Sequence, residues 1–384
     1  MDATTLLLFL AGLGLLILGA ELLVRGASRL AAAVGVSPLV IGLTIVAYGT
    51  SAPELAVSVK AGLAGQTDIA VGNIVGSNIF NVLFILGASA LVAPLVISQQ
   101  LIRWDVPIMI GVSVLAMLLG LDGRIGPVEG LMLLAGLAAY TVLVIRLAKR
   151  EKNQQVRDEY AKQYAARDQP AGTSKVLHVG YCLAGLVSLV AGTRWFVNGA
   201  MTLAAALGVS ELVIGLTIVA AGTSMPELFT SIVAAIRGER DIAVGNVVGS
   251  CIFNILAILG ASALAAPGGL RVSQHLLWVD IPVMIGAAVA CLPIFFTGLR
   301  ISRWEGAVFL GYYAAYVLYL ILKSRADGGG DQGALAAFKT AMFFLVMPLT
   351  ALTLTVTAFR AIRAGGRAAT GAAGPPGPAG GQTA

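Results

Sequence analysis

Residues 42–94 read GLTIVAYGTSAPELAVSVKAGLAGQTDIAVGNIVGSNIFNVLFILGASALVAP, and a second copy follows 173 positions later. That copy, residues 215–267, reads GLTIVAAGTSMPELFTSIVAAIRGERDIAVGNVVGSCIFNILAILGASALAAP. The two align without a gap, and 37 of their 53 positions are identical. Each copy carries one acidic residue inside an apolar stretch, Glu54 in the first and Glu227 in the second. A carboxylate at membrane depth is costly, so a functional role is its default interpretation.

Composition places the chain among polytopic helical membrane proteins. Of its 384 residues, 58% are hydrophobic and only 11% are charged, against about 25% charged in soluble domains. Apolar runs of about 20 residues, the length that spans a bilayer, recur along the chain. The run that begins at Thr4 is long enough to remain a membrane helix, so we expect no cleaved signal peptide. The sequence therefore predicts an all-α polytopic membrane protein.

Ten predicted spans fall into two sets of five, and an eleventh follows at Ala334–Phe359. The predicted spans are 4–24, 38–63, 68–91, 104–121 and 127–147 in the first set, and 176–198, 211–236, 241–264, 275–296 and 304–322 in the second. The predicted divisions are a first five-helix repeat at 1–147, a polar linker at 148–175, a second repeat at 176–323, an extra helix at 324–363 and a disordered tail at 364–384.

An odd number of spans per half has a geometric consequence. The second half must enter the membrane from the opposite side, so the two repeats are inverted relative to each other, as in many transporters. This arrangement puts 18 of the 25 Lys and Arg residues on the side of the central linker. The positive-inside rule then predicts a cytoplasmic linker and an external N-terminus, in the plasma (inner) membrane. The net charge of +6 is spread over short loops, so it does not indicate nucleic-acid binding.

Glycine and proline predict a helix break directly before each acidic residue. Proline lacks an N–H and pushes the preceding residue out of the helical region, and glycine lowers the steric cost of a break. These residues are Gly49 and Pro53 in the first copy, and Gly222 and Pro226 in the second. Carbonyls at the broken helix end, two hydroxyls and one carboxylate per copy would form an oxygen-rich pocket. A simple kink, or an accidental buried acid paired with Arg194, is the alternative interpretation.

The segment that follows each broken helix adds a polar face. Asparagine and serine recur there every four residues and therefore share one side of a helix. The residues are Asn73, Ser77 and Asn81 in the first copy, and Asn246, Ser250 and Asn254 in the second. Asn73 and Asn246, near the segment starts, are as suited to interhelical hydrogen bonding as to ion contact. Asn81 and Asn254 lie deeper and are the stronger candidates for ligands.

The chemistry of this cluster favours a hard cation. Calcium takes about six to eight oxygen ligands, and two glutamates offset its two charges. Sodium accepts the same oxygens, whereas soft metals prefer Cys and His, which do not join the cluster. His178 and His275 are expected to be isolated. No catalytic dyad or His-Glu-x-x-His motif is present, so the sequence favours a transporter over an enzyme and leaves a passive cation channel open.

The paired blocks G-T-S-x-P-E-L and G-N-x-x-G-S-x-x-F-N resemble the alpha-repeats of the calcium/cation antiporter superfamily, particularly prokaryotic sodium/calcium exchangers. The resemblance implies ten helices in inverted fives, a central calcium site flanked by sodium sites, and first and sixth helices that slide past the rest. It also implies the following ligands: Glu54, Glu227, Asn81, Asn254, Thr50, Thr223, Ser51, Ser224, Ser77, Ser250, and the carbonyls of Ala47 and Ala220.

The resemblance predicts sodium-for-calcium exchange, with calcium and sodium ions and membrane lipid as partners and no resident cofactor. Calcium/proton exchangers of the superfamily place their acid in a Gly-Asn-x-x-Glu context, so the Pro-Glu pairs here favour sodium. Exchange of calcium or another divalent cation for protons is the alternative. Some relatives carry aspartate where this chain has Asn254, which leaves one titratable group fewer here. The oligomeric state is left open.

Overall fold

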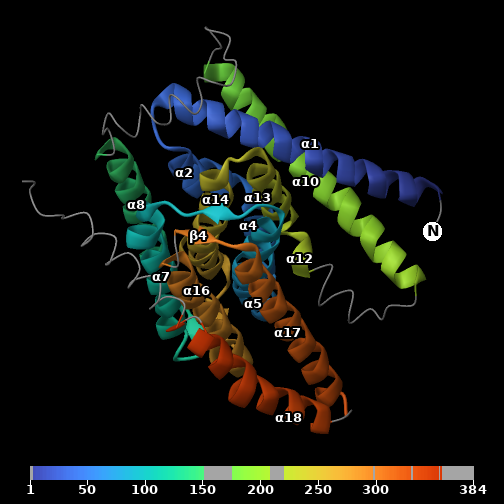
Figure 1. Cartoon of the computed structure of the whole chain (residues 1–384). Helices are drawn as coiled ribbons and strands as arrows, with labels where there is room; N and C mark the ends of the chain where they lie inside the picture. The colour runs from blue at the N-terminus through green and yellow to red at the C-terminus, as the bar shows by residue number, and fades with distance from the viewer. Residues whose placement is uncertain are drawn as a thin grey trace, which may run out of the picture.

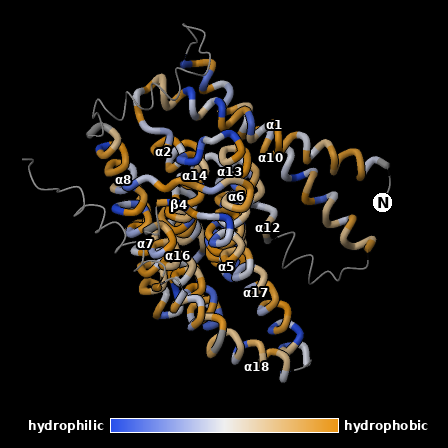
Figure 2. Tube along the Cα trace, viewed as in Figure 1, coloured by the Kyte–Doolittle hydropathy of each residue, from blue (hydrophilic) through white to orange (hydrophobic). Residues whose placement is uncertain are grey.

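A computed structural model describes residues 3–150, 175–207, 220–296, 299–329, 332–353 and 355–356. Within these ranges nine helices are long and apolar enough to cross a membrane, and the bent pair Pro38–Thr50 with Ala52–Leu63 makes a tenth. The predicted span 211–236 begins outside the described residues. The prediction of an all-α polytopic membrane protein is confirmed, and Figure 2 shows hydrophobic colouring along most of the helical segments.

The first half contains helices, three π-helical turns (η) and two short strands. In order they are α1 (Ala3–Val34), α2 (Pro38–Ile41), η1 (Gly42–Val46), α3 (Ala47–Thr50), α4 (Ala52–Leu63), α5 (Thr67–Ile79), η2 (Phe80–Ile85), α6 (Leu86–Val92), β1 (Leu95–Val96), η3 (Leu101–Asp105), α7 (Val106–Leu119), β2 (Arg124–Ile125) and α8 (Pro127–Arg150).

The second half repeats this order as far as the structure describes it. Its elements are α10 (Lys175–Ala206), α12 (Ala220–Gly222), α13 (Met225–Arg237), α14 (Arg240–Phe253), η5 (Asn254–Leu259), α15 (Gly260–Ala265), β3 (Leu270–Arg271), η6 (Leu276–Asp280), α16 (Ile281–Phe296), β4 (Arg300–Ile301) and α17 (Arg303–Asp327). The extra C-terminal span begins with α18 (Gln332–Ala341) and η7 (Met342–Val346).

Several helices run beyond the apolar segments that predicted them. Helix α1 continues to Val34, about ten residues past the predicted end, and α17 continues to Asp327. The segment between the halves is shorter than the predicted linker, because α8 reaches Arg150 and α10 begins at Lys175. The rest of the linker and the predicted tail at 364–384 lie outside the described residues.

Glycines bring helices of the two halves into backbone contact. A Cβ placed on Gly130 of α8 would lie 2.7 Å from the Gly260 carbonyl of α15, and one on Gly306 of α17 would lie 2.7 Å from the Gly87 carbonyl of α6. Such close approach requires residues without side chains. The third segment of each half therefore crosses the fifth segment of the other half.

Helices α1 and α10 form an antiparallel pair at one edge of the molecule (Figure 1). A Cβ on Gly19 would lie 2.8 Å from the Gly185 carbonyl, and one on Gly12 would lie 2.9 Å from the Gly192 carbonyl. These glycines recur every seven residues in each helix, so they fall on one face and form a smooth contact surface.

Two short antiparallel strand pairs close the ends of the bundle. Strand β1 pairs with β4, and β2 pairs with β3. The connection between spans three and four therefore lies beside that between spans nine and ten, and the connection between spans four and five lies beside that between spans eight and nine. This pairing is compatible with the predicted inversion of the two halves.

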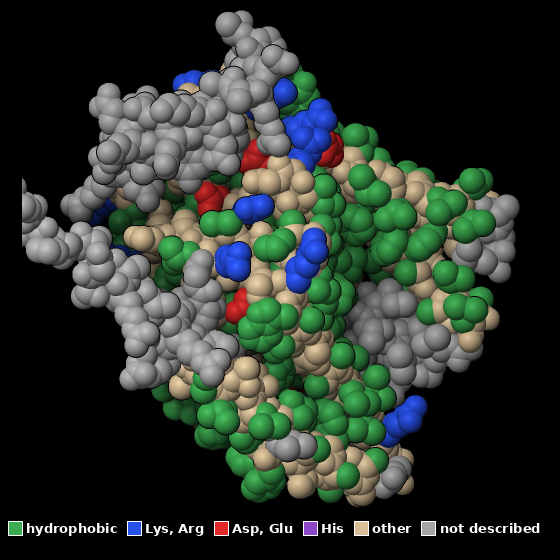
Figure 3. All heavy atoms as spheres, in the orientation of Figure 1, with side chains coloured by type: hydrophobic (Ala, Val, Ile, Leu, Met, Phe, Trp, Pro, Cys, Tyr) green, Lys and Arg blue, Asp and Glu red, His purple; other side chains and the backbone are tan. Residues whose placement is uncertain are grey.

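The outer surface suits a lipid environment. Hydrophobic side chains cover much of the face visible in Figure 3, and most of the visible Lys and Arg side chains lie in its upper half. Val187 of α10 and Val128 of α8 are 70% and 69% exposed, as expected for side chains that face acyl chains.

Polar contacts fasten α1 to the turn between α13 and α14. Glu21 forms ion pairs with Arg25, at 2.6 Å, and with Arg237 at the end of α13. Further along α1, Ser28 donates a hydrogen bond of 3.1 Å to the buried Glu239 carboxylate. Helix α1 is thus attached to the rest of the protein by charged groups at this end.

The glycine crossings predict a sharp difference between two substitutions. Gly130→Ala would press a methyl group against the Gly260 carbonyl, so the helices must separate, at a cost of about 1–3 kcal/mol. Gly111→Ala in α7 is the matched control, because outside its neighbours and its own helix backbone no atom of the described residues lies within 4 Å of the place its new methyl group would take. Thermal unfolding in detergent should show a clearly lower Tm for Gly130→Ala alone. Equal stability of the two variants would contradict the close crossing.

Candidate cation site

Both predicted helix breaks are present, and a serine lies at each. Ser51, with φ −80° and ψ 8°, separates α3 from α4, and the two helical parts are bent by 46°. Ser224, with φ −86° and ψ 11°, separates α12 from α13 in the same way. Proline follows at the first turn of each new helix, where its missing N–H costs nothing. Glu54 and Glu227 therefore lie in the first turn of a helix, where the helix dipole favours a negative charge.

The two breaks face each other, and each holds the carboxylate of the other. Ser51 Oγ donates a hydrogen bond of 2.8 Å to Glu227 Oε1, and Ser224 Oγ donates one of 2.7 Å to Glu54 Oε1. Both carboxylates are buried, with 1% and 0% of each residue exposed. Residues 170 and 176 positions apart in the chain thus form one reciprocal cluster at the centre of the bundle.

The remaining oxygens of this cluster lack hydrogen-bond donors. Within the described part of the chain, buried oxygens without a partner include Glu54 Oε2, Glu227 Oε2, Asn81 Oδ1, Asn254 Oδ1 and Ser77 Oγ. Unpaired buried oxygens of this kind are expensive, and a carboxylate far more so than an amide. A bound cation would satisfy all of them at once. Five of the twelve predicted ligands therefore present free oxygen here.

Asn246 connects the elements around the cluster through hydrogen bonds. Its Oδ1 accepts a hydrogen bond of 3.1 Å from Thr50, and its Nδ2 donates to Ser231 Oγ at 3.0 Å and to the Glu227 carbonyl at 3.3 Å. The mirror-related contacts are Thr223 to Asn73 at 3.3 Å, Asn73 to Ser58 Oγ at 2.9 Å and Asn73 to the Glu54 carbonyl at 3.4 Å. Of the two roles left open for these outer asparagines, the structure shows interhelical hydrogen bonding. The threonine hydroxyls donate to them and so support the site from outside.

Three further predicted ligands are Ala47, Ser250 and Ala220, and the first two already take part in hydrogen bonds. The Ala47 carbonyl accepts from Ser51 N at 3.1 Å, from Thr50 Oγ1 at 3.3 Å and from Ser250 Oγ at 3.4 Å. Ala47 and Ser250 therefore satisfy each other in this conformation. Ala220 is the first residue of α12, directly before the second break.

The two deep asparagines lie at the start of π-helical turns. Asn81 is the second residue of η2, and Asn254 is the first of η5. A π-helical turn inside an α-helix is uncommon and frequently marks a functional site. Here the wider turn occurs at the level of the unpaired oxygens in both halves. Periodicity in the sequence does not predict it.

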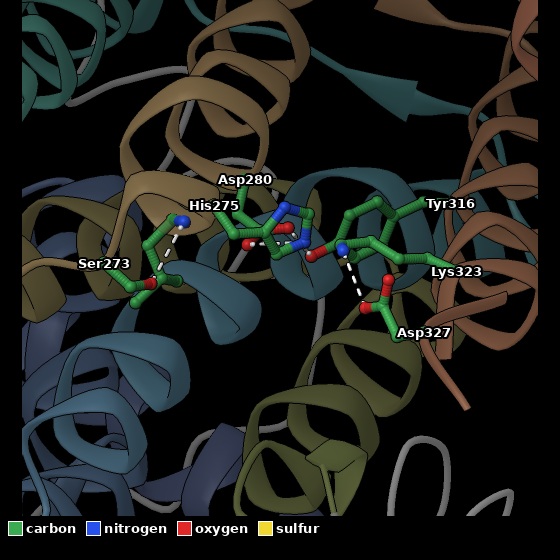
Figure 4. Close-up of polar contacts among 7 residues, drawn as sticks. Ser273, His275, Asp280, Tyr316, Lys323 and Asp327 are labelled. Carbon is green, nitrogen blue, oxygen red and sulfur yellow. Dashed lines mark hydrogen bonds and ion pairs between the residues drawn. The ribbon is translucent and has the colours of Figure 1, made fainter. Parts of the chain in front are cut away.

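A second polar network lies outside the cluster (Figure 4). Tyr316 donates a hydrogen bond of 2.9 Å to Asp280 Oδ1, and His275 Nε2 lies 3.6 Å from Asp280 Oδ2. The expectation that His275 is isolated is therefore wrong. In the first half Tyr140 donates to Asp105 Oδ1 at 3.1 Å and Gln100 donates to Asp105 Oδ2 at 3.2 Å. The two networks tie the fourth span of each half to the fifth and are separate from the cation cluster.

Comparison with known proteins places the chain in a family. The family model for sodium/calcium exchanger protein matches residues 4–146 and 177–322, most of the chain. The chain belongs to this family. Membership makes it a multi-pass membrane protein of the cation antiporter type, as the resemblance of its paired blocks implied.

The matches extend over nearly the whole length of the individual relatives. A protein of Alkalimonas amylolytica named as the putative antiporter CaxA is 39% identical over 318 residues, 82% of this chain and 98% of that protein. The sodium/calcium exchanger MaX1 of Methanosarcina acetivorans is 33% identical over 83% of this chain and 99% of its own. The solved structure of the sodium-calcium exchanger NCX_Mj, soaked with Na⁺ and Ca²⁺, superposes with a TM-score of 0.70 at 30% identity and covers 83% of this chain and 99% of that one.

The reciprocal serine contacts predict the effect of removing them. Ser51→Ala frees the Glu227 carboxylate to rotate, and Ser224→Ala does the same for Glu54. Each should weaken Ca²⁺ binding about 10-fold to 100-fold, the usual loss when a hydrogen bond that orients a metal ligand is removed. Equilibrium binding of ⁴⁵Ca²⁺ to purified protein measures this. Ser113→Ala removes a buried hydroxyl that, within the described part of the chain, bonds only to the Met109 carbonyl of its own helix, so it should leave binding unchanged. Equal losses in all three variants would contradict a specific role for the two break serines.

Proposed function

We propose that this protein exchanges sodium for calcium across the membrane by alternating access, without chemical conversion of either ion. The observation that carries the proposal is the pair of buried glutamates, each held by the serine of the opposite break with one carboxylate oxygen left free. Two such carboxylates require about two positive charges between them. Membership in the exchanger family supports the same assignment.

One Ca²⁺ between the breaks would match both the charge and the ligand type. Calcium binds carboxylate, amide and carbonyl oxygens at about 2.3–2.6 Å, in flexible geometry. Glu54 Oε2, Glu227 Oε2, Asn81 Oδ1 and Asn254 Oδ1 are the side-chain oxygens we assign to it. The carbonyl of Gly49 is a further candidate, because Pro53 has no N–H to donate to it.

Sodium would use the same oxygens in a different distribution. We assign Na⁺ ions to positions that share Glu54 or Glu227 and add the Ser77 hydroxyl and the Ala47 or Ala220 carbonyl. Occupation by Na⁺ requires those oxygens to turn from their present donors, such as Ser250 on Ala47. Competition for two shared carboxylates is what couples the two ions, since neither species can occupy the site fully while the other is bound. Soft metals are not expected, because the described residues contain no group of three or more His, Cys, Asp or Glu side chains.

Access would alternate by movement of α1 and α10 against the rest. Close glycine contacts hold these two helices together as one unit (Figure 1). At one end, α1 is attached to the rest by Glu21, which pairs with Arg237, and by Ser28, which donates to Glu239. We assign the conformational change that antiport requires to movement of this pair of helices, which would break and re-form these contacts.

Carboxamide substitution tests the role of the acids directly. Glu54→Gln and Glu227→Gln keep the side-chain volume but remove one negative charge each, so sodium-driven ⁴⁵Ca²⁺ uptake into proteoliposomes should fall to background. Unchanged elution on size exclusion shows that the fold is intact. Asp122→Asn, at an exposed loop carboxylate, is the matched control and should transport normally. Substantial uptake by both glutamate variants would remove these residues from the site.

The coupling ion is tested with the same vesicles. An outward Na⁺ gradient at equal pH on both sides should drive Ca²⁺ uptake, whereas a pH gradient in sodium-free buffer should not. Uptake driven only by the pH gradient would replace sodium exchange with calcium/proton exchange. Ca²⁺ entry that stops at equilibration and does not depend on either gradient would indicate a passive cation channel.

We further propose the plasma membrane as the location, with the N-terminus outside and the linker at 148–175 in the cytoplasm. Single cysteines at the exposed positions Gln99 and Asp122 test this orientation. A membrane-impermeant maleimide applied to intact cells should label Asp122→Cys and leave Gln99→Cys unlabelled. The native Cys182, Cys251 and Cys291 are buried, so the background is low. The opposite labelling pattern would invert the topology.

A further inference from the structure

The polar segments that line the site differ between the halves at one polar position. Residues 72–81 read GNIVGSNIFN and residues 245–254 read GNVVGSCIFN. Apart from an Ile/Val exchange, the only difference is Asn78 in the first half and Cys251 in the second. Both side chains are buried, with 2% and 1% of the residue exposed. Neither belongs to the predicted ligands, so the repeated motif leaves this difference unexplained.

Hydrogen bonds determine which way the Asn78 amide points. Its Nδ2 donates to the Cys251 carbonyl at 3.2 Å and also lies 3.5 Å from Met284 Sδ. A backbone carbonyl can only accept, so the nitrogen end of Asn78 must face it. The oxygen end then points the other way, where it accepts a hydrogen bond of 2.9 Å from Asn254 Nδ2. The ambiguity of amide orientation is therefore removed by the backbone.

The same chain of contacts determines the orientation of Asn254. Its Nδ2 is directed to Asn78, so its Oδ1 faces the opposite direction, where the described residues offer it no donor. This is one of the free oxygens at the breaks. The Cys251 carbonyl, Asn78 and Asn254 thus form a relay that presents an acceptor, and never a donor, to the site.

The corresponding chain of contacts to Asn81 runs through a thiol in place of an amide. The residue equivalent to Asn78 is Cys251, whose thiol lies 3.9 Å from the Asn78 carbonyl and against the Asn81 side chain. A thiol is a weak hydrogen-bonding group and cannot impose an orientation as an amide does. Asn81 and Asn254 are therefore equivalent in sequence but not in the way they are held.

We propose that Asn78 is a positioning residue, which orients the Asn254 side chain so that its oxygen faces the transported cation and so makes the two half-sites unequal. The proposal rests on the cation site of the proposed function and adds a residue that acts through a ligand. Without Asn78 the Asn254 amide can turn its NH₂ group toward the ion. Removal should then weaken Ca²⁺ binding about 10-fold, within the range for groups that orient metal ligands.

A double-mutant cycle on the full-length chain tests this, with ⁴⁵Ca²⁺ binding measured in sodium-free buffer. Asn78→Ala should raise the Kd about 10-fold alone and to the same extent in combination with Asn81→Ala. In combination with Asn254→Ala it should have no further effect, because the residue through which it acts is gone. Cys251→Ala, at the equivalent position, should change the Kd less than about 3-fold. These results together support the relay.

Two outcomes would contradict the positioning role of Asn78. An equal effect of Asn78→Ala in the Asn254→Ala and Asn81→Ala backgrounds would show that Asn78 only packs the core, as would a Cys251→Ala loss of the same size. If Asn78→Ala does not fold, Asn78→Cys in reducing buffer gives both halves the same residue and should show the same cycle. Failure of the wild-type protein to bind Ca²⁺ would overturn the cation site itself, whereas binding with an additive cycle overturns the relay alone.

Discussion

Two carboxylates buried side by side are the constraint on which the rest of the structure depends. Removal of one carboxylate from water is costly, and its neighbour adds repulsion. The protein compensates in part, because each glutamate begins a helix and accepts one hydrogen bond from the opposite serine. One oxygen of each glutamate has no hydrogen-bond donor among the described residues. In the proposed function, a bound cation would offset the remaining negative charge.

The duplicated motif produces this site from two similar halves, but the halves are not identical. Glu21 and Arg237 form an ion pair at one end of α1. The aligned positions of the other half, Arg194 and Ala64, cannot form an equivalent pair. The Asn78 and Cys251 difference is a second departure at the centre. Near symmetry explains how one motif builds both sides of the site, and these departures are where the two sides acquire different strengths.

Much of the fold could be predicted from the sequence because its signals are local. Apolar length predicted the spans, and Gly49 with Pro53 predicted a break that the structure places at Ser51. The gathering of acids, serines and deep asparagines followed from duplication of the motif. The ends of the spans were predicted less accurately than the spans themselves. Helix α1 continues to Val34 through a charged turn that hydropathy does not count as membrane, because Arg25 pairs with Glu21 there.

Partnerships between distant side chains could not be predicted. The start of a span suggests a carboxylate near water, yet Asp105 is fully buried because Tyr140 and Gln100 reach it from other positions. The hydrogen bond from Thr50 to Asn246 and the one from Asn78 to the Cys251 carbonyl likewise join residues more than a hundred positions apart. The glycines at every seventh position of α1 and α10 were visible in the sequence and would have predicted the contact between these helices.

The most direct measurement is diffraction from crystals grown in Ca²⁺ without Na⁺, recorded at a wavelength where calcium scatters anomalously. The account predicts one strong peak between Ser51 and Ser224, within about 2.3–2.6 Å of Glu54 Oε2 and Glu227 Oε2. A peak bound by neither carboxylate, or no peak at saturating Ca²⁺, would contradict the claim that these two acids share one cation.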